Sequence, residues 1–131
     1  MLIKRIHLSI LLFITIAAFS LVFSPRAEAL GCDSSVVRWA STSNTIYVTG
    51  PVTCTLSEIK AVRPTAPLEQ VDPAGKIWLL KTNLKLEGGA TLNLHGSPAG
   101  GDVNQLRLKS NNSSAANSII WIRAQWGKIG I

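Results

Sequence analysis

Short runs of alternating apolar and polar residues dominate the second half of the chain. From Ile77 onward, five such runs are separated by stretches rich in Gly, Asn and Ser. Alternation places the apolar side chains on one face of a β-strand, whereas glycine and asparagine favour turns. The pattern predicts short strands at residues 84–86, 92–94, 106–108, 120–122 and 129–131, with a glycine bend at residues 87–90.

Helical spacing occurs at one place after residue 30. Leu56, Ile59 and Val62 allow one short amphipathic helix, with Ser57 as a possible N-cap and Pro64 ending it. Prolines and Gly75 then predict an exposed loop at residues 63–75, between an N-terminal segment and the strand region.

The runs at 84–86, 106–108 and 129–131 recur at a nearly constant interval, and a second series, at 92–94 and 120–122, lies between them with a somewhat longer interval. A repeat of roughly 22 residues with very short strands is typical of a parallel β-solenoid. Its coils stack about 4.8 Å apart and share one core. A small antiparallel sandwich or meander is the alternative, because it also contains short alternating strands.

The amino terminus has the pattern of an export signal. Two basic residues precede an apolar run of about 16 residues, and Ala27-Glu28-Ala29 supplies small residues for cleavage after Ala29. A retained membrane anchor is the alternative, but the run is shorter than the roughly 20 residues that span a bilayer. We therefore expect membrane contact only during export and a secreted, extracellular or periplasmic location.

Removing residues 1–29 changes the composition of the chain. The whole chain has 131 residues and a net charge of +6, whereas residues 30–131 hold ten basic and six acidic residues, a net charge of +4. Cys32 and Cys54 are the two cysteines of the chain. In an oxidising compartment we expect them to form a structural disulfide, because no His or CxxC pattern indicates a reactive thiol.

Residues 77–96, continuing through 106–110, resemble the opening coils of secreted right-handed parallel β-helix proteins, in particular those similar to mannuronan C5-epimerases, which act on alginate-type uronic acid polymers. The resemblance implies an all-β fold: the first coils of a right-handed parallel β-helix behind a short strand and helix cap. It divides the chain into a signal peptide at 1–29, a cap segment with a Pro-rich loop at 30–76, and coils at 77–131.

The strand pattern runs up to Ile131 without a polar cap. An uncapped coil exposes a sheet edge and an apolar core. We therefore expect a truncated chain or a fragment. Its C-terminal edge would be covered by the remainder of the β-helix or by a self-associating partner.

The catalytic motif of the epimerase family, Asp-Pro-His-His, is not matched. Asp72-Pro73 is followed by Ala74-Gly75, which we interpret as a turn, and His95 follows a strand without an acid or base partner. Single, scattered carboxylates do not indicate a metal site. We expect no catalytic, cofactor or metal residues in this chain; epimerase- or lyase-like activity would reside in downstream coils.

The predicted coils place basic residues on an outer face. If residues 84–86 stack on residues 106–108, Lys85 lies beside Arg107, and Glu87 lies beside Lys109. Like charges at this distance repel mildly, which hints at a polyanionic ligand. Arg123 and Lys81 could extend the row, and Trp121 would point outward as a platform for sugars. The candidate polysaccharide-binding residues are Lys85, Arg107, Lys109, Trp121 and Arg123.

A second interpretation of this face involves no ligand: Glu87 pairs with Lys109, and Trp121 packs beneath a loop.

Nucleic acid is a poor candidate for the anionic partner because export separates the chain from it and the charge is thinly spread. The sequence thus predicts an exported β-helix fragment associated with acidic polysaccharide. A non-enzymatic surface or matrix scaffold is the alternative function.

Overall fold

The computed structural model describes residues 31–111 and 118–131, so the predicted signal peptide lies outside the described residues. Within them, no helix is long and apolar enough to span a bilayer. The elements in chain order are β1 (Val37–Ala40), β2 (Thr45–Thr49), β3 (Thr53–Thr55), α2 (Leu56–Val62), β4 (Leu68–Asp72), β5 (Ile77–Leu80), β6 (Asn83–Glu87), β7 (Thr91–Asn93), the 3₁₀ helix η1 (Ser97–Ala99), β8 (Gln105–Leu108), β9 (Ile122–Gln125) and β10 (Lys128–Gly130).

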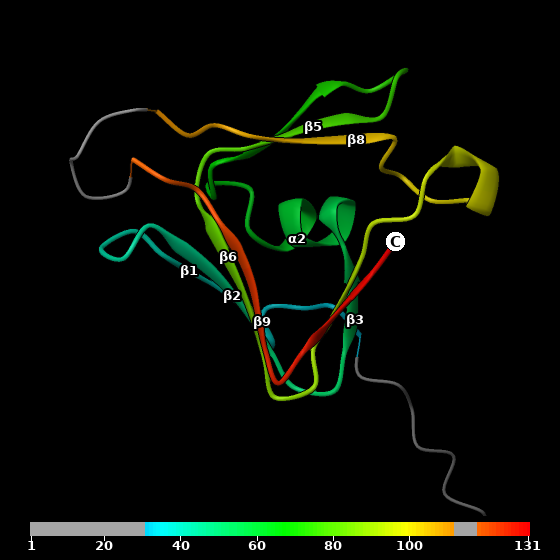
Figure 1. The fold of residues 1–131 in the computed structure, drawn as a ribbon. Helices are drawn as coiled ribbons and strands as arrows, with labels where there is room; N and C mark the ends of the chain where they lie inside the picture. The colour runs from blue at the N-terminus through cyan, green and yellow to red at the C-terminus, as the bar shows by residue number, and fades with distance from the viewer. Residues whose placement is uncertain (1–30, 112–117) are drawn as a thin grey trace, which may run out of the picture.

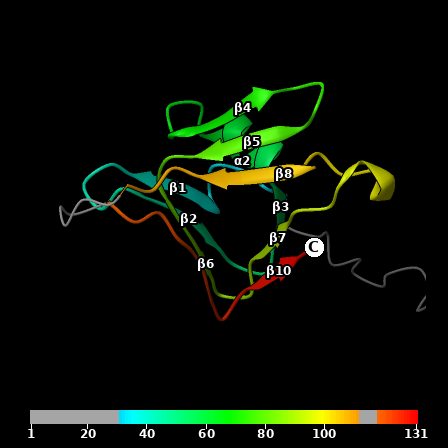
Figure 2. The same cartoon turned by 45° about the horizontal axis from the view of Figure 1, so that its top comes forward.

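The strands form three small sheets around one core, with α2 between the sheets in the view of Figure 1. The strand orders are β1-β2-β6-β9, β3-β7-β10 and β4-β5-β8. The second sheet is parallel throughout, whereas β1 is antiparallel to β2 and β4 is antiparallel to β5, so the other two are mixed. The predicted right-handed parallel β-helix is therefore wrong: the described residues form three small sheets and no closed solenoid (Figure 2).

The pairing register explains why the predicted repeat fails. Leu84 in β6 pairs with Ile122 in β9 and not with Leu106. Leu106 in β8 pairs instead with Trp78 in β5. The nearly constant interval seen in the sequence therefore joins strands of different sheets. Alternation has the same period in every strand and carries no information about which strands are neighbours.

Most of the predicted strands exist with shifted ends. Residues 84–86 lie in β6 and residues 106–108 in β8, while β7 and β10 each end one residue before the predicted strand does. The run at 120–122 is displaced most, because β9 begins at Ile122. Local alternation thus found β6 to β10 but not their exact bounds, and it gave no bounds for β1 to β5.

The predicted glycine bend connects β6 to β7. Gly88 and Gly89 have φ values of +61° and +91°, in the region that favours glycine. The bend is hydrogen-bonded to the corner between β2 and β3 and to the corner between β9 and β10. The Gly50 amide donates to the Glu87 carbonyl at 3.1 Å, and the Gly89 amide donates to the Trp126 carbonyl at 2.6 Å. These bonds hold the three corners of adjacent strands together.

Helix α2 forms where predicted, but its N-cap is Thr55 and not Ser57. Thr55 and Glu58 form a reciprocal capping box, in which the Glu58 amide donates to Thr55 Oγ1 at 3.2 Å and the Thr55 amide donates to Glu58 Oε2 at 2.8 Å. The amide and hydroxyl of Ser57 both donate to the carboxylate of Asp102. Asp102 thereby attaches the connection between β7 and β8 to the start of α2.

The core is built from the inward faces of the sheets and one side of α2. The Trp78 indole is 2% exposed and donates to the Asp102 carbonyl at 2.9 Å, which satisfies its one polar group. The other large side chains that are fully buried are Ile46, Leu56, Ile59, Leu68, Leu80, Leu84, Leu86, Leu92, Val37, Val48 and Thr82.

The predicted disulfide between Cys32 and Cys54 is confirmed, with a Cα–Cα distance of 5.3 Å. It joins the segment before β1 to β3 and closes a loop with a sequence separation of 22 residues. Arg63, after α2, reinforces the same region by donating to the carbonyls of Val37 at 2.8 Å and Ser34 at 2.9 Å. The N-terminal part of the described chain is therefore fixed by a covalent bond and by hydrogen bonds.

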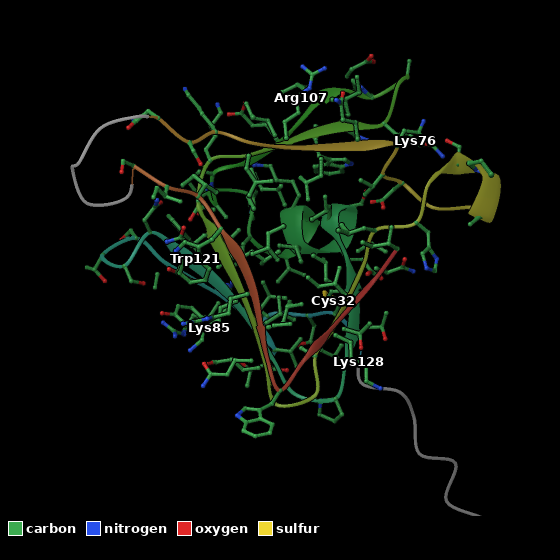
Figure 3. The ribbon with its side chains drawn as sticks, in the orientation of Figure 1. Cys32, Lys76, Lys85, Arg107, Trp121 and Lys128 are labelled. Atoms are coloured by element: carbon green, nitrogen blue, oxygen red, sulfur yellow. A yellow bond between two sulfur atoms is a disulfide. The ribbon has the colours of Figure 1, made fainter. Side chains whose placement is uncertain are left out.

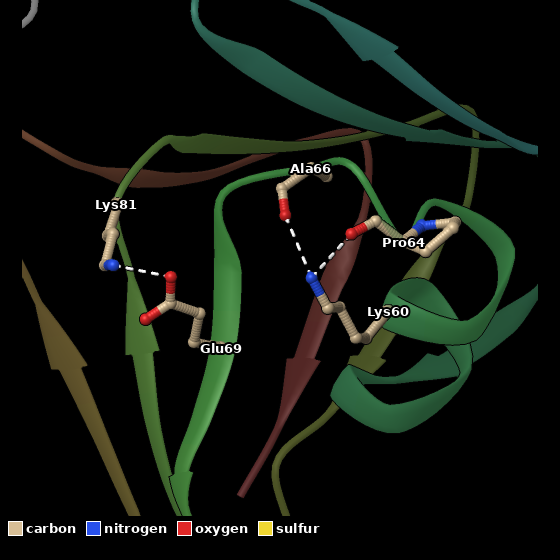
Figure 4. Close-up of polar contacts among 5 residues, drawn as sticks. All are labelled: Lys60, Pro64, Ala66, Glu69 and Lys81. Carbon is tan, nitrogen blue, oxygen red and sulfur yellow. Dashed lines mark hydrogen bonds and ion pairs between the residues drawn. The ribbon is translucent and has the colours of Figure 1, made fainter.

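The predicted loop at residues 63–75 is only partly a loop, because it contains β4, which forms an antiparallel pair with β5. The turn prediction for Asp72-Pro73 is confirmed: Asp72 ends β4, and its Oδ1 accepts a hydrogen bond from the Gly75 amide at 2.9 Å. Glu69 of β4 forms an ion pair with Lys81 at 2.5 Å, and Lys60 of α2 donates to the Pro64 and Ala66 carbonyls (Figure 4).

Candidate functional site

A row of one aromatic and three basic side chains crosses the four-stranded sheet. The register places Arg38 of β1 beside Tyr47 of β2, Tyr47 beside Lys85 of β6, and Lys85 beside Arg123 of β9. Their sequence neighbours on these strands include Ile46, Val48, Leu84 and Leu86, which are at most 1% exposed and form the inward face. The four residues of the basic row, as we call Arg38, Tyr47, Lys85 and Arg123, therefore occupy the outward face.

Tyr47 lies between two of the cations. The Arg38 guanidinium carbon lies 4.1 Å from the centre of the Tyr47 ring, and the Lys85 ammonium nitrogen lies 5.9 Å from it. Both distances fall within the range of cation–π attraction, which offsets part of the repulsion between the two charges. The Ser43 hydroxyl lies 3.5 Å from the Tyr47 hydroxyl, and this hydrogen bond is the main cause that lowers the pKa of Tyr47.

Lys85 has one acidic partner, Glu87, two residues along the same strand and on the same face. Their charged atoms are 2.5 Å apart, and their side chains are 22% and 32% exposed. The next positions along this face place Glu87 between Thr49 of β2 and Gln125 of β9, both uncharged. Among the described residues of this face, the three cations of the basic row thus exceed the one nearby carboxylate.

A cavity of about 430 Å³ lies at the β9 end of the row. The described residues that line it are Trp121, Ile122 and Arg123. Trp121 is held at the start of β9 by two backbone contacts: its carbonyl accepts from the Leu84 amide at 3.0 Å, and its amide donates to Asn83 Oδ1 at 3.3 Å. An aromatic residue and a basic residue therefore line one concave space next to the basic row.

The structure brings together three of the five candidate binding residues and separates the other two. Lys85 and Arg123 are cross-strand neighbours, Trp121 and Arg123 line one cavity, and Figure 3 shows Lys85 and Trp121 on the same side of the four-stranded sheet. Arg107 lies on another sheet, where its partner is Leu79 of β5, and its guanidinium donates to Gln105 Oε1 at 2.9 and 3.1 Å. The predicted neighbourhood of Lys85 and Arg107 is therefore wrong.

Lys109 is also displaced from its expected position. It follows β8, with its amide donating to the Leu80 carbonyl at 2.9 Å, so it does not lie beside Glu87. Lys81, an expected extension of the row, is instead engaged with Glu69 (Figure 4). Both placements follow from the strand pairing: Lys109 follows β8, which pairs with β5, and Lys81 follows β5, which also pairs with β4, the strand that contains Glu69.

Two residues of the basic row, Arg38 and Tyr47, were missed from the sequence. A signal was present, because residues 37–40 and 45–49 alternate apolar and polar positions around a short polar turn. That pattern is typical of a β-hairpin with Arg38 and Tyr47 facing outward. Neither strand belongs to the predicted repeat, so the repeat directed attention away from them.

His95 lies in the connection after β7. Its amide donates to Asn93 Oδ1 at 3.1 Å, and its carbonyl accepts from the Val103 amide at 3.2 Å. Gly101 packs so closely against this backbone that a Cβ atom there would lie 1.8 Å from the His95 carbonyl oxygen. The described contacts of His95 therefore shape a turn.

Comparison with protein-family models, curated protein sequences and solved structures found no match for this chain. The resemblance to mannuronan C5-epimerase-like proteins is therefore neither supported nor contradicted by a relative. The candidate site rests on the geometry of the basic row and of the cavity beside it.

Proposed function

We propose that this protein is exported and binds an acidic polysaccharide on the outward face of the β1-β2-β6-β9 sheet. The observation that carries the proposal is the lateral alignment of Arg38, Lys85 and Arg123 across four strands. Cross-strand neighbours of like charge destabilise a sheet, and a bound polyanion would relieve this repulsion. The disulfide supports the location, because such bonds persist in oxidising compartments.

The geometry of the row fits a linear polymer of uronic acids better than a single small anion. Adjacent strands lie about 4.8 Å apart, so the cations spread over roughly 14 Å across the sheet. A uronic acid polymer carries one carboxylate on each sugar and presents its charges along a line. Trp121 and the cavity beside Arg123 offer an aromatic edge and a space for a sugar ring at one end of that line.

The proposed function is tested by binding of a uronic acid polymer to a charge-removal variant. Lys85→Ala/Arg123→Ala deletes two cations of the row, and Arg107→Ala/Lys109→Ala deletes two cations on another sheet as a matched control. Each exposed ion pair contributes about 0.2–1 kcal/mol, so loss of two predicts weakening by roughly 2- to 30-fold. Isothermal titration calorimetry with an alginate oligomer measures the affinity at low and high salt.

We expect the first double variant to bind more weakly, the control to bind as the unchanged protein does, and salt to weaken binding in both. A neutral glucan should not compete. Equal weakening by both double variants would disprove a localised site, and salt-independent binding would disprove recognition by charge.

A further inference from the structure

Strands β8, β9 and β10 lie at the outer edges of their sheets on the same side of the molecule. Each of them pairs with one inner strand: β8 with β5, β9 with β6, and β10 with β7. The connection between β9 and β10 follows the β6–β7 bend around the same corner (Figures 1 and 2). We call the surface formed by residues 105–109 and 119–131 the open edge.

The backbone of the open edge alternates between inward and outward hydrogen-bonding groups. In β10, the Lys128 amide donates to Ala90 and the Gly130 carbonyl accepts from Leu94, both at 2.8 Å. Ile129, between them, therefore directs its N–H and C=O away from β7. In β8, the Gln105 and Lys109 amides donate toward β5, so the backbone groups of Leu106 face outward. Such groups form a template for another strand.

Exposed apolar side chains gather on the same surface. Among the described residues, six large hydrophobic side chains are exposed, and five belong to the open edge. The exception is Val71 of β4. The five, with their exposed fractions, are Leu108 at 42%, Ile119 at 68%, Trp126 at 85%, Ile129 at 40% and Ile131 at 95%. Exposed apolar side chains that share one surface favour contact with a partner there.

All charged side chains of the open edge are basic. They are Arg107, Lys109, Arg123 and Lys128, all exposed, and residues 105–109 and 119–131 contain no Asp or Glu. Figure 3 shows Arg107 and Lys128 on different sides of the core, so the basic side chains of the open edge are spread along it. Pairing with a second copy through this edge would bring like charges together, which is a known means of preventing self-association.

We infer that the open edge binds an extended segment of another polypeptide by strand addition, and that this segment alternates apolar and acidic residues. The outward backbone groups supply the hydrogen bonds, and the exposed apolar side chains supply the contact area. The basic rim, by which we mean Arg107, Lys109, Arg123 and Lys128, selects acidic side chains. This inference does not rest on the proposed polysaccharide site, because most of its residues lie on other strands.

A synthetic peptide of alternating Val and Glu, labelled with fluorescein, serves as the probe for fluorescence anisotropy with the whole protein. One control peptide has Lys in place of each Glu, and another has the same Val and Glu sequence with N-methyl groups on alternate backbone amides. We expect binding of the first peptide, weakened by salt, and at least about tenfold weaker binding of both controls, since one loses charge attraction and the other loses ladder hydrogen bonds.

Two pairs of variants locate the binding surface. Ile129→Pro removes an outward N–H while keeping the Lys128 and Gly130 bonds to β7, and Ile129→Ala removes the side chain alone. Arg107→Glu/Lys128→Glu reverses the rim charge, and Arg38→Glu reverses a charge on β1, at the opposite edge of its sheet. We expect Ile129→Pro to bind the Val/Glu peptide at least about fivefold more weakly than Ile129→Ala does. We expect Arg107→Glu/Lys128→Glu to bind it at least about fivefold more weakly than Arg38→Glu does.

Several results would overturn the inference. Equal binding of the Glu and Lys peptides excludes charge selection, and full binding of the N-methylated peptide excludes strand addition. If sedimentation shows that the unchanged protein forms dimers and that Ile129→Pro abolishes them, the occupant of the open edge is a second copy of this chain. If Ile129→Pro does not fold, the charge variants still decide. Failure here leaves polysaccharide binding unaffected, because that site is tested by Lys85→Ala/Arg123→Ala.

Discussion

Replacing Gly127 with alanine tests the close packing of the β9–β10 corner against the β6–β7 bend. A Cβ atom at Gly127 would lie 2.7 Å from the Ala90 carbonyl oxygen and 2.8 Å from the Leu86 Cβ. Neither atom is the end of a flexible side chain, and Leu86 is fully buried. The corner must therefore move outward, which stretches the bonds that join Gly89 to Trp126 and Lys128 to Ala90.

The magnitude follows from two opposing effects. Overpacking of this kind costs about 1–3 kcal/mol. Alanine also restricts the unfolded chain, which stabilises by about 0.4–1 kcal/mol. The clash is on average the larger effect, so Gly127→Ala should lower the free energy of unfolding by about 1.3 kcal/mol at the midpoints and by at most about 2.6 kcal/mol. Each kcal/mol lowers Tm by about 4–8 °C in a domain of this size.

Thermal and urea unfolding followed by circular dichroism measure this loss. Gly31→Ala is the matched control, because nothing lies within 4 Å of a Cβ there; its change should stay within about 0.5 kcal/mol. Amide hydrogen exchange locates the effect, since protection at Gly89 and Lys128 should fall first. Unchanged stability of Gly127→Ala together with unchanged protection of these two amides would show that the corner is not packed as described.

Two further predictions concern the disulfide and an ion pair. The double variant Cys32→Ala/Cys54→Ala should lose about 3 kcal/mol of stability in urea unfolding, because the bond no longer closes its loop in the unfolded chain. A reducing agent should destabilise the unchanged protein equally and the variant not at all. An unchanged protein that is insensitive to the reducing agent would contradict this prediction. The hydrogen bond from Lys81 lowers the pKa of Glu69, so the stabilisation is present above the ordinary pKa of glutamate and is lost as pH falls through the lowered value. Lys81→Met should raise the Glu69 pKa in an NMR titration, and an unshifted titration would refute the pairing.

Local features of the fold could be predicted from the sequence because their causes are local. The bend at Gly88 and Gly89 follows from two adjacent glycines between alternating runs, and helix α2 follows from apolar spacing and a proline after its end. The disulfide was predicted from two cysteines in a chain with a predicted export signal. Ser57 was the predicted N-cap, although Thr55 and Glu58 have the spacing of a capping box in the sequence, and Thr55 is the N-cap in the structure.

The candidate site was predicted only in part. Lys85 and Arg123 were singled out for their place between apolar residues, which an alternating pattern reveals. Their cross-strand contact was not predicted, because the predicted repeat paired Lys85 with Arg107 instead. Strands of equal period look alike in sequence, whereas their lateral partners depend on the length of the connections and on the fit of the core.

The sequence by itself determined the approximate places of β6 to β10, the apolar face of each, and which cysteines pair. Alternation and turn residues reflect interactions between residues that are close in the chain, and two cysteines leave one possible pairing. The tertiary structure alone decided that Arg38, Tyr47, Lys85 and Arg123 form one row and that β8, β9 and β10 share one open edge. Those arrangements depend on the register between strands that lie far apart in the sequence, which packing of the shared core selects.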